Sequence, residues 1–180
     1  STTRCLPFVC TLLVLAFAAP RLGHAQAKQY APGVCDYERN PVTFRVALPL
    51  GATAETVVRG MFINGNPGTD DLLGWAINSQ FRRYAGRFGF GTMSSRGVDG
   101  TRTFNQYAAW FFEALDGCGK LLGHPELGNA PFVALGNSSA GANAWGLAAN
   151  KPDRAIAFGT NIPMPPNPGS ANAQQRAVPG

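Results

Sequence analysis

The sequence predicts an α/β protein, with a mostly parallel sheet flanked by helices, on the basis of three observations. Apolar segments of strand length alternate along the chain with segments whose apolar residues recur at helical spacing. Clusters of Gly, Pro, Asn and Asp separate most of these segments, as turns require. The length of 180 residues fits a single domain without internal repeats. Alternation of this kind is typical of a parallel sheet that helices cover on both faces.

The first 27 residues are predicted to be a secretory signal peptide. Arg4 precedes an apolar run at about residues 6–19, and Ala-Gln-Ala at 25–27 supplies the small residues of a cleavage site. The apolar run is short for a membrane span, so we expect a secreted or periplasmic protein without a membrane partner after cleavage. The polar, proline-bearing residues 28–41 are expected to form a mature N-terminal arm.

Residues 42–161 are predicted to form the core, and its strands are recognised by apolar alternation or by short apolar runs. "VTFRVALP" alternates, "TVVRGMFI" and "FGFGTMSS" are short and apolar, and "PFVALGN" is an apolar run bounded by turn residues. "RAIAFGTN" follows a Lys-Pro-Asp turn. These segments place strands at 42–49, 56–63, 88–95, 131–137 and 154–161.

The helices of this core are recognised by their spacing of apolar residues. "LLGWAINSQFRRYAGR" and "TFNQYAAWFFEALDGCGKLL" each carry an apolar side, and in the second it is an aromatic stripe that we assign to core packing. "SSAGANAWGLAAN" is small and free of proline. Helices are therefore expected at 72–87, 103–122 and 138–150. The proline-rich residues 162–180 are expected to be an irregular tail, the start of a loop or lid.

The charge pattern excludes several classes of partner. The net charge of +5 is modest, and three basic residues share one predicted helix as an ordinary solvated face: Arg82, Arg83 and Arg87. This is not a nucleic-acid-binding stripe. The sequence also lacks a Cys/His cluster with metal spacing and a phosphate-binding glycine loop, so we expect no metal and no cofactor. It does not predict an oligomeric state.

Cysteine usage leaves two alternatives open. Cys5 and Cys10 lie in the predicted signal peptide, so Cys35 and Cys118 are the cysteines of the mature chain. An exported protein meets an oxidising compartment, where these two could form a disulfide. The alternative is a pair of free, buried thiols.

A motif for nucleophilic catalysis lies at residues 136–140, Gly-Asn-Ser-Ser-Ala, which fits Gly-x-Ser-x-Gly with Ala in the last place. It follows a predicted apolar strand and opens a predicted helix, the context of a strained strand-to-helix turn that tolerates only small neighbours of the nucleophile. The start of a helix also offers unpaired N–H groups and a positive dipole end to an oxyanion. These features favour Ser138 as a catalytic nucleophile.

Three other interpretations compete for this segment. A serine at a helix start often serves as an N-cap, and Asn137 opens an N-glycosylation sequon. Ser139 is also a candidate nucleophile, flanked by Asn137 and Gly141. The small flanks Gly136 and Ala140 favour Ser138, because Asn fits the first small position of the turn less well than Gly.

The longer segment "HPELGNAPFVALGNSSAGANAWGLAANKPDRAIAF" resembles the esterase-type α/β-hydrolase superfamily around its nucleophile elbow. Members often have a His-Pro-Glu-Leu turn, then the central strand, Gly-His-Ser-Ala-Gly-Gly, a helix and a Pro-Asp/Glu-Arg turn. Secreted members include polyhydroxyalkanoate-depolymerase-like and feruloyl-esterase-like enzymes. The resemblance covers about residues 42–161 and is strongest at 124–158. The chain departs from the pattern at Asn137, which is often His, and at Ala140, which is often Gly.

This resemblance implies an α/β-hydrolase fold and a carboxylic ester hydrolase that forms an acyl-enzyme on Ser138. It implies one oxyanion donor, the backbone N–H of Ser139, and a second near Gly65 or Asn66 in the loop 64–68. The implied partner is a small-molecule or polymer ester substrate.

The other members of a catalytic triad are missing from the expected positions. The family places an acid and then a histidine after the serine, yet only Asp153 follows Ser138 and no histidine does. His124 precedes a strand of seven residues, roughly 23 Å long, and is therefore expected at the opposite end of the sheet.

The plainest interpretation of this gap is a chain that ends after the sixth strand of an eight-strand fold, incomplete at its C-terminus and inactive by itself. A second hypothesis is a non-catalytic secreted binding protein on a degenerate hydrolase scaffold. A third is a base supplied by a partner chain. The nucleotide sequence downstream of codon 180 discriminates between the first two.

Overall fold

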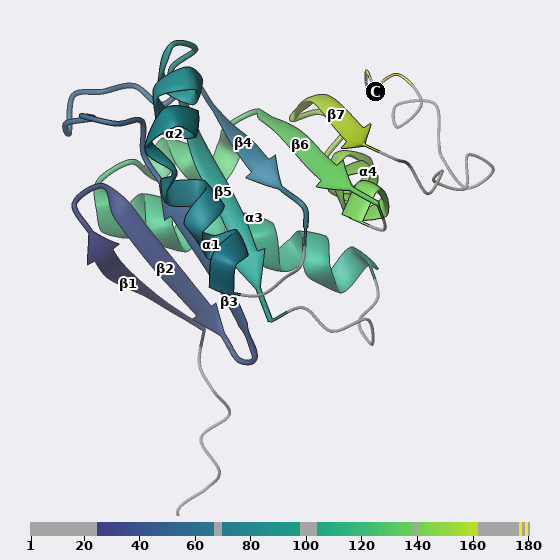
Figure 1. Ribbon diagram of the computed structural model, residues 1–180. Helices are drawn as coiled ribbons and strands as arrows, with labels where there is room; N and C mark the ends of the chain where they lie inside the picture. The colour runs from purple at the N-terminus through teal and green to yellow at the C-terminus, as the bar shows by residue number, and fades with distance from the viewer. Residues whose placement is uncertain are drawn as a thin grey trace, which may run out of the picture.

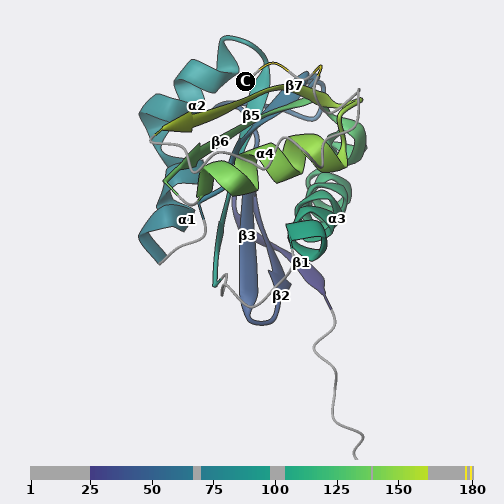
Figure 2. The same ribbon diagram turned by 90° about the vertical axis from the view of Figure 1, so that its right-hand side faces the viewer.

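A seven-stranded mixed sheet with helices on both faces forms the centre of the molecule (Figure 1). This computed structural model describes residues 25–66, 70–97, 104–138, 140–161, 177 and 179. The strand order is β1-β2-β3-β5-β4-β6-β7. In Figure 2, α1 and α2 lie on one face of the sheet, and α3 and α4 lie on the other. The predicted α/β class is therefore confirmed.

Residues 28–41, predicted as a mature N-terminal arm outside the core, form part of the sheet. Most of this segment lies in β1 (Gln26–Ala31) and β2 (Val34–Arg39), which pair antiparallel with each other. Its polar residues suit this position, because β1 is an edge strand that water reaches. The buried carboxylate of Asp36 in β2 is paired with Arg45, so its polarity also fits a strand.

Antiparallel pairing continues to β3 (Val42–Ala47), which joins β5 (Phe90–Arg96). From β5 onward the sheet is parallel, through β4 (Gly60–Asn64), β6 (Phe132–Asn137) and β7 (Ala155–Asn161). Ile63 at the sheet centre pairs with Met93 and Ala134 on its two sides, and all three are fully buried. The carboxyl ends of the four parallel strands consequently share one edge.

The helix expected at 72–87 is divided into α1 (Asp70–Ile77) and α2 (Ser79–Gly86). Asn78 separates them: its ψ of 119° is not helical, and its side chain accepts a hydrogen bond from the Phe81 N–H at 3.0 Å. Asn78 is therefore the N-cap of α2, a role that Asn side chains favour over a position inside a helix.

The other predicted helices are α3 (Phe104–Leu122) and α4 (Ala140–Asn150), and a 3₁₀ helix, η1 (Pro125–Asn129), precedes β6. The aromatic side of α3 packs on the sheet as expected, with Phe111 contacting Phe44 at 4.9 Å between ring centroids. A disulfide joins Cys35 in β2 to Cys118 in α3 across this core, which selects one of the two alternatives for these cysteines.

Most of the predicted signal peptide, residues 1–24, lies outside the described residues. Gln26 and Ala27 form the first two positions of β1, so cleavage at the predicted site would shorten that strand from its N-terminal end. No helix in the described part of the chain combines the length and apolar character needed to cross a membrane. The predicted proline-rich tail also lies outside the described residues, except for 177 and 179.

Candidate active site

The junction between β6 and α4 holds Ser138 in a conformation that serine rarely adopts. Its φ is +56°, and it is the sole non-glycine residue with a positive φ in the described ranges. Left-handed backbone is uncommon for residues with a Cβ and marks a local constraint. A nucleophile elbow imposes this constraint on its serine, whereas an N-cap residue has β-region backbone. The backbone therefore argues against the N-cap interpretation of Ser138.

The same junction requires glycine two residues earlier. A Cβ added at Gly136 would lie 2.0 Å from the carbonyl oxygen of Ala140, so the first turn of α4 packs directly on the strand end. Two hydrogen bonds fix the turn: Ser138 N–H donates to Asn161 O at 2.9 Å, and Gly141 N–H donates to Ser138 O at 2.9 Å. The small flanking residue predicted from the sequence thus has a direct steric reason.

A network of asparagine side chains connects this turn to the end of β4. Asn137 N–H donates to Asn66 Oδ1 at 2.9 Å, and Asn66 N–H donates to Asn64 Oδ1 at 3.0 Å. Asn143 Nδ2 of α4 donates to Gly65 O at 2.9 Å. The loop after β4 and the turn after β6 are therefore held together by polar contacts from three elements.

The structure also shows which N–H groups of the predicted oxyanion loop are engaged. Gly65 N–H donates to Leu135 O at 2.7 Å, which continues the ladder between β4 and β6. The Asn66 N–H donates to a side-chain oxygen, Asn64 Oδ1, and Asn66 is half-buried whereas Gly65 is buried. Asn66 is thus the more accessible donor of the two, while Ser139 and residues 67–69 lie outside the described residues.

A pocket of about 460 Å³ opens beside this turn, between α1 and the ends of β4, β6 and β7. Leu72, Trp75 and Leu135 give it apolar walls. Its polar lining comes from strand ends and the residues after them: Asn64, Asn66, Asn137, Thr160 and Asn161. An apolar pocket with a few polar groups at one side is typical of small-molecule sites in its size range.

His124 and Asp153 both lie at the opposite edge of the sheet from Ser138. His124 precedes η1 at the amino end of β6, is 2% exposed, and has Nδ1 2.9 Å from Glu126 Oε1. Asp153 lies in the turn that leads into β7. The expectation that His124 is a satisfied turn histidine, distant from the serine, is confirmed.

The carboxylate of Glu126 holds this far edge together. Partial burial raises its pKa, but hydrogen bonds involving His124, its own backbone and the Val58 N–H outweigh burial, so the net pKa lies below the ordinary value. The contact with Val58, at 3.3 Å, ties the segment before β4 to η1. These groups perform a structural task at the end of the sheet that lacks the serine.

The asparagine network was not predicted from the sequence. The resemblance implies a backbone donor near Asn66, but it does not imply the contact of the Asn66 side chain with the Asn137 N–H. The relevant signal is the set of asparagines that end or follow the parallel strands, but one sequence gives no way to separate these from ordinary turn residues. Their proximity depends on the strand register, which only the three-dimensional structure supplies.

Comparison with protein-family models and with curated protein sequences finds no match for this chain. Comparison with solved structures finds distant similarity to esterases and a lipase over most of the chain.

Three of these structures illustrate the likeness. Esterase 2 of Thermogutta terrifontis, in its apo form, has 16% sequence identity and a TM-score of 0.42, covering 89% of this chain and 64% of that chain. An acetyl xylan esterase from Aspergillus awamori has 13% identity and a TM-score of 0.45, and the match covers 78% of this chain and 53% of that chain. A thermostable carboxyl esterase from Bacillus coagulans, in complex with glycerol, has 13% identity and a TM-score of 0.45, and the match covers 76% of this chain and 43% of that chain. The chain thus spans less than two thirds of the length of each.

Proposed function

We propose that this chain carries the nucleophile and oxyanion side of a serine carboxylic ester hydrolase. The observation that carries the proposal is the backbone of Ser138, whose φ of +56° places the residue on a strained turn between β6 and α4. Strain of this kind is retained when the surrounding structure enforces it, and here the packing of Gly136 against Ala140 does so. A turn that exposes its serine at the carboxyl edge of a parallel sheet suits nucleophilic attack.

In the proposed reaction, Ser138 Oγ attacks the ester carbonyl and a tetrahedral intermediate forms. Its oxyanion accepts hydrogen bonds from the Ser139 N–H at the start of α4 and from Asn66 after β4. Collapse of the intermediate expels the alcohol and leaves an acyl group on Ser138, which water then removes. The pocket walls at Leu72 and Trp75 would receive an apolar part of the ester.

Activation of Ser138 requires a base, because a serine hydroxyl is a weak nucleophile at neutral pH. His124 and Asp153 lie at the wrong edge of the sheet for this task. We therefore assign the acid and the histidine of the triad to parts of the protein outside the described residues. Oxidised Cys35 and Cys118 support the proposal that the protein is secreted or periplasmic, since such disulfides persist in oxidising compartments.

A second candidate function is binding without catalysis, on the same scaffold. It is favoured by the distance of both candidate partners from Ser138, since an elbow without its base would retain a pocket but no activated nucleophile. In this case the pocket beside Asn66 would hold a ligand without turnover.

Hydrolysis of p-nitrophenyl esters by the protein expressed from its complete reading frame tests the proposal. The Ser138→Ala variant should lose at least about 10³-fold in kcat/KM. The matched variant Ser139→Ala keeps its backbone N–H and should stay within about tenfold of wild type. Loss of activity in Ser139→Ala alone would identify Ser139 as the nucleophile. Absence of turnover in the wild-type protein would favour the binding function.

A further inference from the structure

A second hollow, of about 410 Å³, lies at the opposite edge of the sheet from Ser138. Its walls come from α2 and from the segment 49–56, which connects β3 to β4. Pro49, Leu50 and Gly86 contribute apolar surface to it. The volume lies within the range of small-molecule sites. The hollow is separate from the proposed ester site, which uses the carboxyl ends of the strands.

Three arginines of α2 and its C-terminal end line this hollow: Arg82, Arg83 and Arg87. Arg83 and Arg87 are exposed and four residues apart, so they lie on the same side of the helix. Within the described part of the chain, neither has an ion-pair partner. None of the described residues that line the hollow is acidic. The nearby Glu55 carboxylate is engaged elsewhere, with the Thr53 hydroxyl at 2.7 Å.

Arg82 differs from the other two because it is only 9% exposed. Its Nε and Nη2 donate to the carbonyl oxygen of Leu48 at 3.1 and 2.7 Å, and desolvation lowers its pKa. A guanidinium remains charged under all ordinary conditions, so the wall of the hollow contains a buried positive charge that donates to a neutral carbonyl. Buried charges are ordinarily balanced by an opposite charge, and among the lining residues that the structure describes none provides one.

The prediction that these three arginines form a solvated helix face is wrong for Arg82, which is buried against the Leu48 carbonyl, and holds for Arg83 and Arg87. Arg82 is buried, whereas Arg83 and Arg87 are exposed, and all three line one concavity. A concave surface with charges of a single sign concentrates the electrostatic potential and attracts oppositely charged ligands. The arrangement is compact and does not form the extended stripe that nucleic acids require.

We propose that this hollow binds the anionic group of a small ligand, either a phosphoryl group or a carboxylate. Guanidinium groups match both anions, because their N–H donors form parallel pairs with two oxygens. Arg83 and Arg87 supply these donors, and Arg82 adds a fixed positive charge from the wall. The apolar surface of Pro49 and Leu50 contacts the organic part of the ligand.

Titration of the full chain at low salt, followed by amide chemical shifts in α2 and residues 49–56, tests this proposal. One arm uses inorganic phosphate and the other uses glucuronate, a carboxylate on a ring. We expect saturable shifts with at least one of them at a dissociation constant on the order of 1 mM. Saturation with phosphate alone identifies a phosphoryl ligand, and saturation with glucuronate alone identifies a carboxylate. Absence of saturation in both arms overturns the proposal.

Two double variants distinguish specific binding of the anion in the hollow from its general attraction to a basic protein. The double variant Arg83→Gln/Arg87→Gln should weaken binding at least about tenfold. The control Arg59→Gln/Lys151→Gln removes the same charge outside the hollow and should change binding less than about twofold. Equal losses in the two double variants would overturn the proposal.

A third variant blocks the hollow without changing charge. A Cβ added at Gly86 would meet Pro49 Cβ at an ordinary contact distance of 3.7 Å, so Gly86→Leu places its larger side chain in the hollow. We expect this variant to keep its circular dichroism spectrum and to lose the saturable shifts. Unchanged binding in a folded Gly86→Leu protein would contradict the location of the site.

Discussion

The side-chain oxygen of Asn66 accepts a hydrogen bond from the backbone N–H of Asn137 at 2.9 Å, although the two residues are 71 positions apart. Asn66 follows the central strand β4, and Asn137 directly precedes Ser138 at the end of β6. The contact therefore fixes the distance between the proposed oxyanion loop and the proposed nucleophile. Because β4 ends at Asn64 whereas β6 continues to Asn137, the Asn66 side chain supplies the acceptor that the β4 backbone no longer offers to Asn137.

Replacement of Asn66 by Ala should weaken this connection. The Asn137 N–H would lose its partner, at a cost of about 1 kcal/mol in the free energy of unfolding. The matched variant Asn66→Asp retains an oxygen acceptor and should lose less. Urea unfolding at neutral pH measures both values, and equal stability of the Ala and Asp variants would show that the contact contributes nothing.

Gly136→Ala should be among the most damaging single-methyl additions in the protein. The new Cβ would lie 2.0 Å from Ala140 O, and backbone atoms must move to accommodate it. We expect a loss of about 3 kcal/mol or more in the free energy of unfolding.

Gly74→Ala in α1 is the control for this change. An added Cβ there meets nothing within 4 Å, and alanine has the higher helix propensity, so stability should rise by up to about 1 kcal/mol. A Gly136→Ala protein as stable as Gly74→Ala would refute the tight packing of α4 on β6.

The sequence predicts the core of this fold well because periodicity and turn residues report on local structure. The apolar runs at β4 and β6 and the aromatic side of α3 need little information beyond their own residues. Apolar periodicity does not predict the strands β1 and β2. The edge strand β1 exposes polar side chains, and Asp36 in β2 is a charged residue that is buried because it is paired with Arg45. The break at Asn78 is also not predicted by apolar spacing. It arises because the Asn78 side chain caps α2, which competes with continuation of the helix.

The candidate site is predictable only in part, for a related reason. Ser138 is identified by its small neighbours and by the strand and helix around it. The contacts of Asn66 with Asn137, and of Asn161 with Ser138, depend on which strands are neighbours and in what register. The burial of Arg82 against Leu48 depends on the path of a loop. Neither register nor loop path can be obtained from the local pattern of residues.

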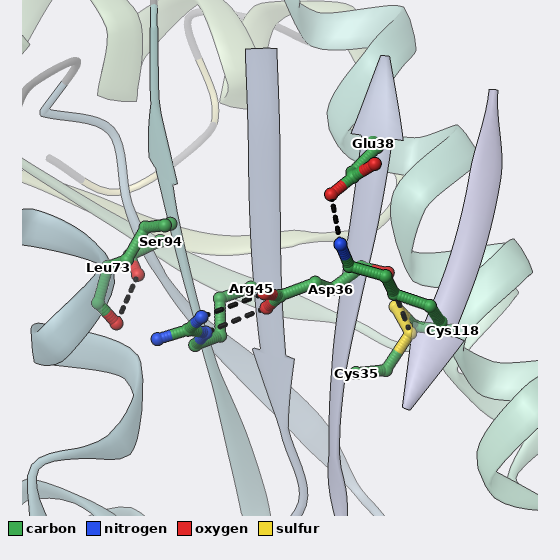
Figure 3. Close-up of polar contacts among 8 residues, drawn as sticks. Cys35, Asp36, Glu38, Arg45, Leu73, Ser94 and Cys118 are labelled. Carbon is green, nitrogen blue, oxygen red and sulfur yellow. Dashed lines mark hydrogen bonds and ion pairs between the residues drawn. A yellow bond between two sulfur atoms is a disulfide. The ribbon is translucent and has the colours of Figure 1, made fainter. Parts of the chain in front are cut away.

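The buried ion pair of Asp36 and Arg45 should respond differently to single and double substitution. Arg45 Nε and Nη2 each donate a hydrogen bond to an Asp36 carboxylate oxygen at 2.7 Å. Figure 3 shows these two side chains facing each other. The hydrogen bond with Asp36 outweighs burial and raises the pKa of Arg45. Asp36→Asn leaves a buried guanidinium without its counter-charge and should cost about 3 kcal/mol or more in unfolding free energy.

The double variant Asp36→Leu/Arg45→Met removes both charges and fills a similar volume. Because no charge is then left unpaired, its stability should be close to wild type, within about 1 kcal/mol. A double-mutant cycle by urea unfolding gives the coupling of the two residues. A double variant as unstable as Asp36→Asn would show that the ion pair itself, and not the avoidance of an unpaired charge, stabilises this edge.

Glu126 lies in η1, at the amino ends of the parallel strands and opposite Ser138. The stability of this end of the sheet should depend on pH through its carboxylate. Because folding lowers the pKa of this carboxylate below its ordinary value of 4.5, its stabilising effect is present above that pH. The effect is lost as the pH falls through the lower, folded-state pKa. Urea midpoints of wild type and Glu126→Gln should therefore differ at neutral pH and converge in acid. A difference that stays constant as the pH falls would contradict this assignment.

The most direct test of the central claim is to map the adduct of a fluorophosphonate probe by tandem mass spectrometry. The protein is expressed from its complete reading frame, labelled, and digested to a peptide that contains both Ser138 and Ser139. If Ser138 is the nucleophile of the strained turn between β6 and α4, the phosphonyl group will be found on Ser138, and Ser138→Ala will abolish labelling while Ser139→Ala retains it. An adduct on Ser139, or no adduct in the folded wild-type protein, would contradict the account.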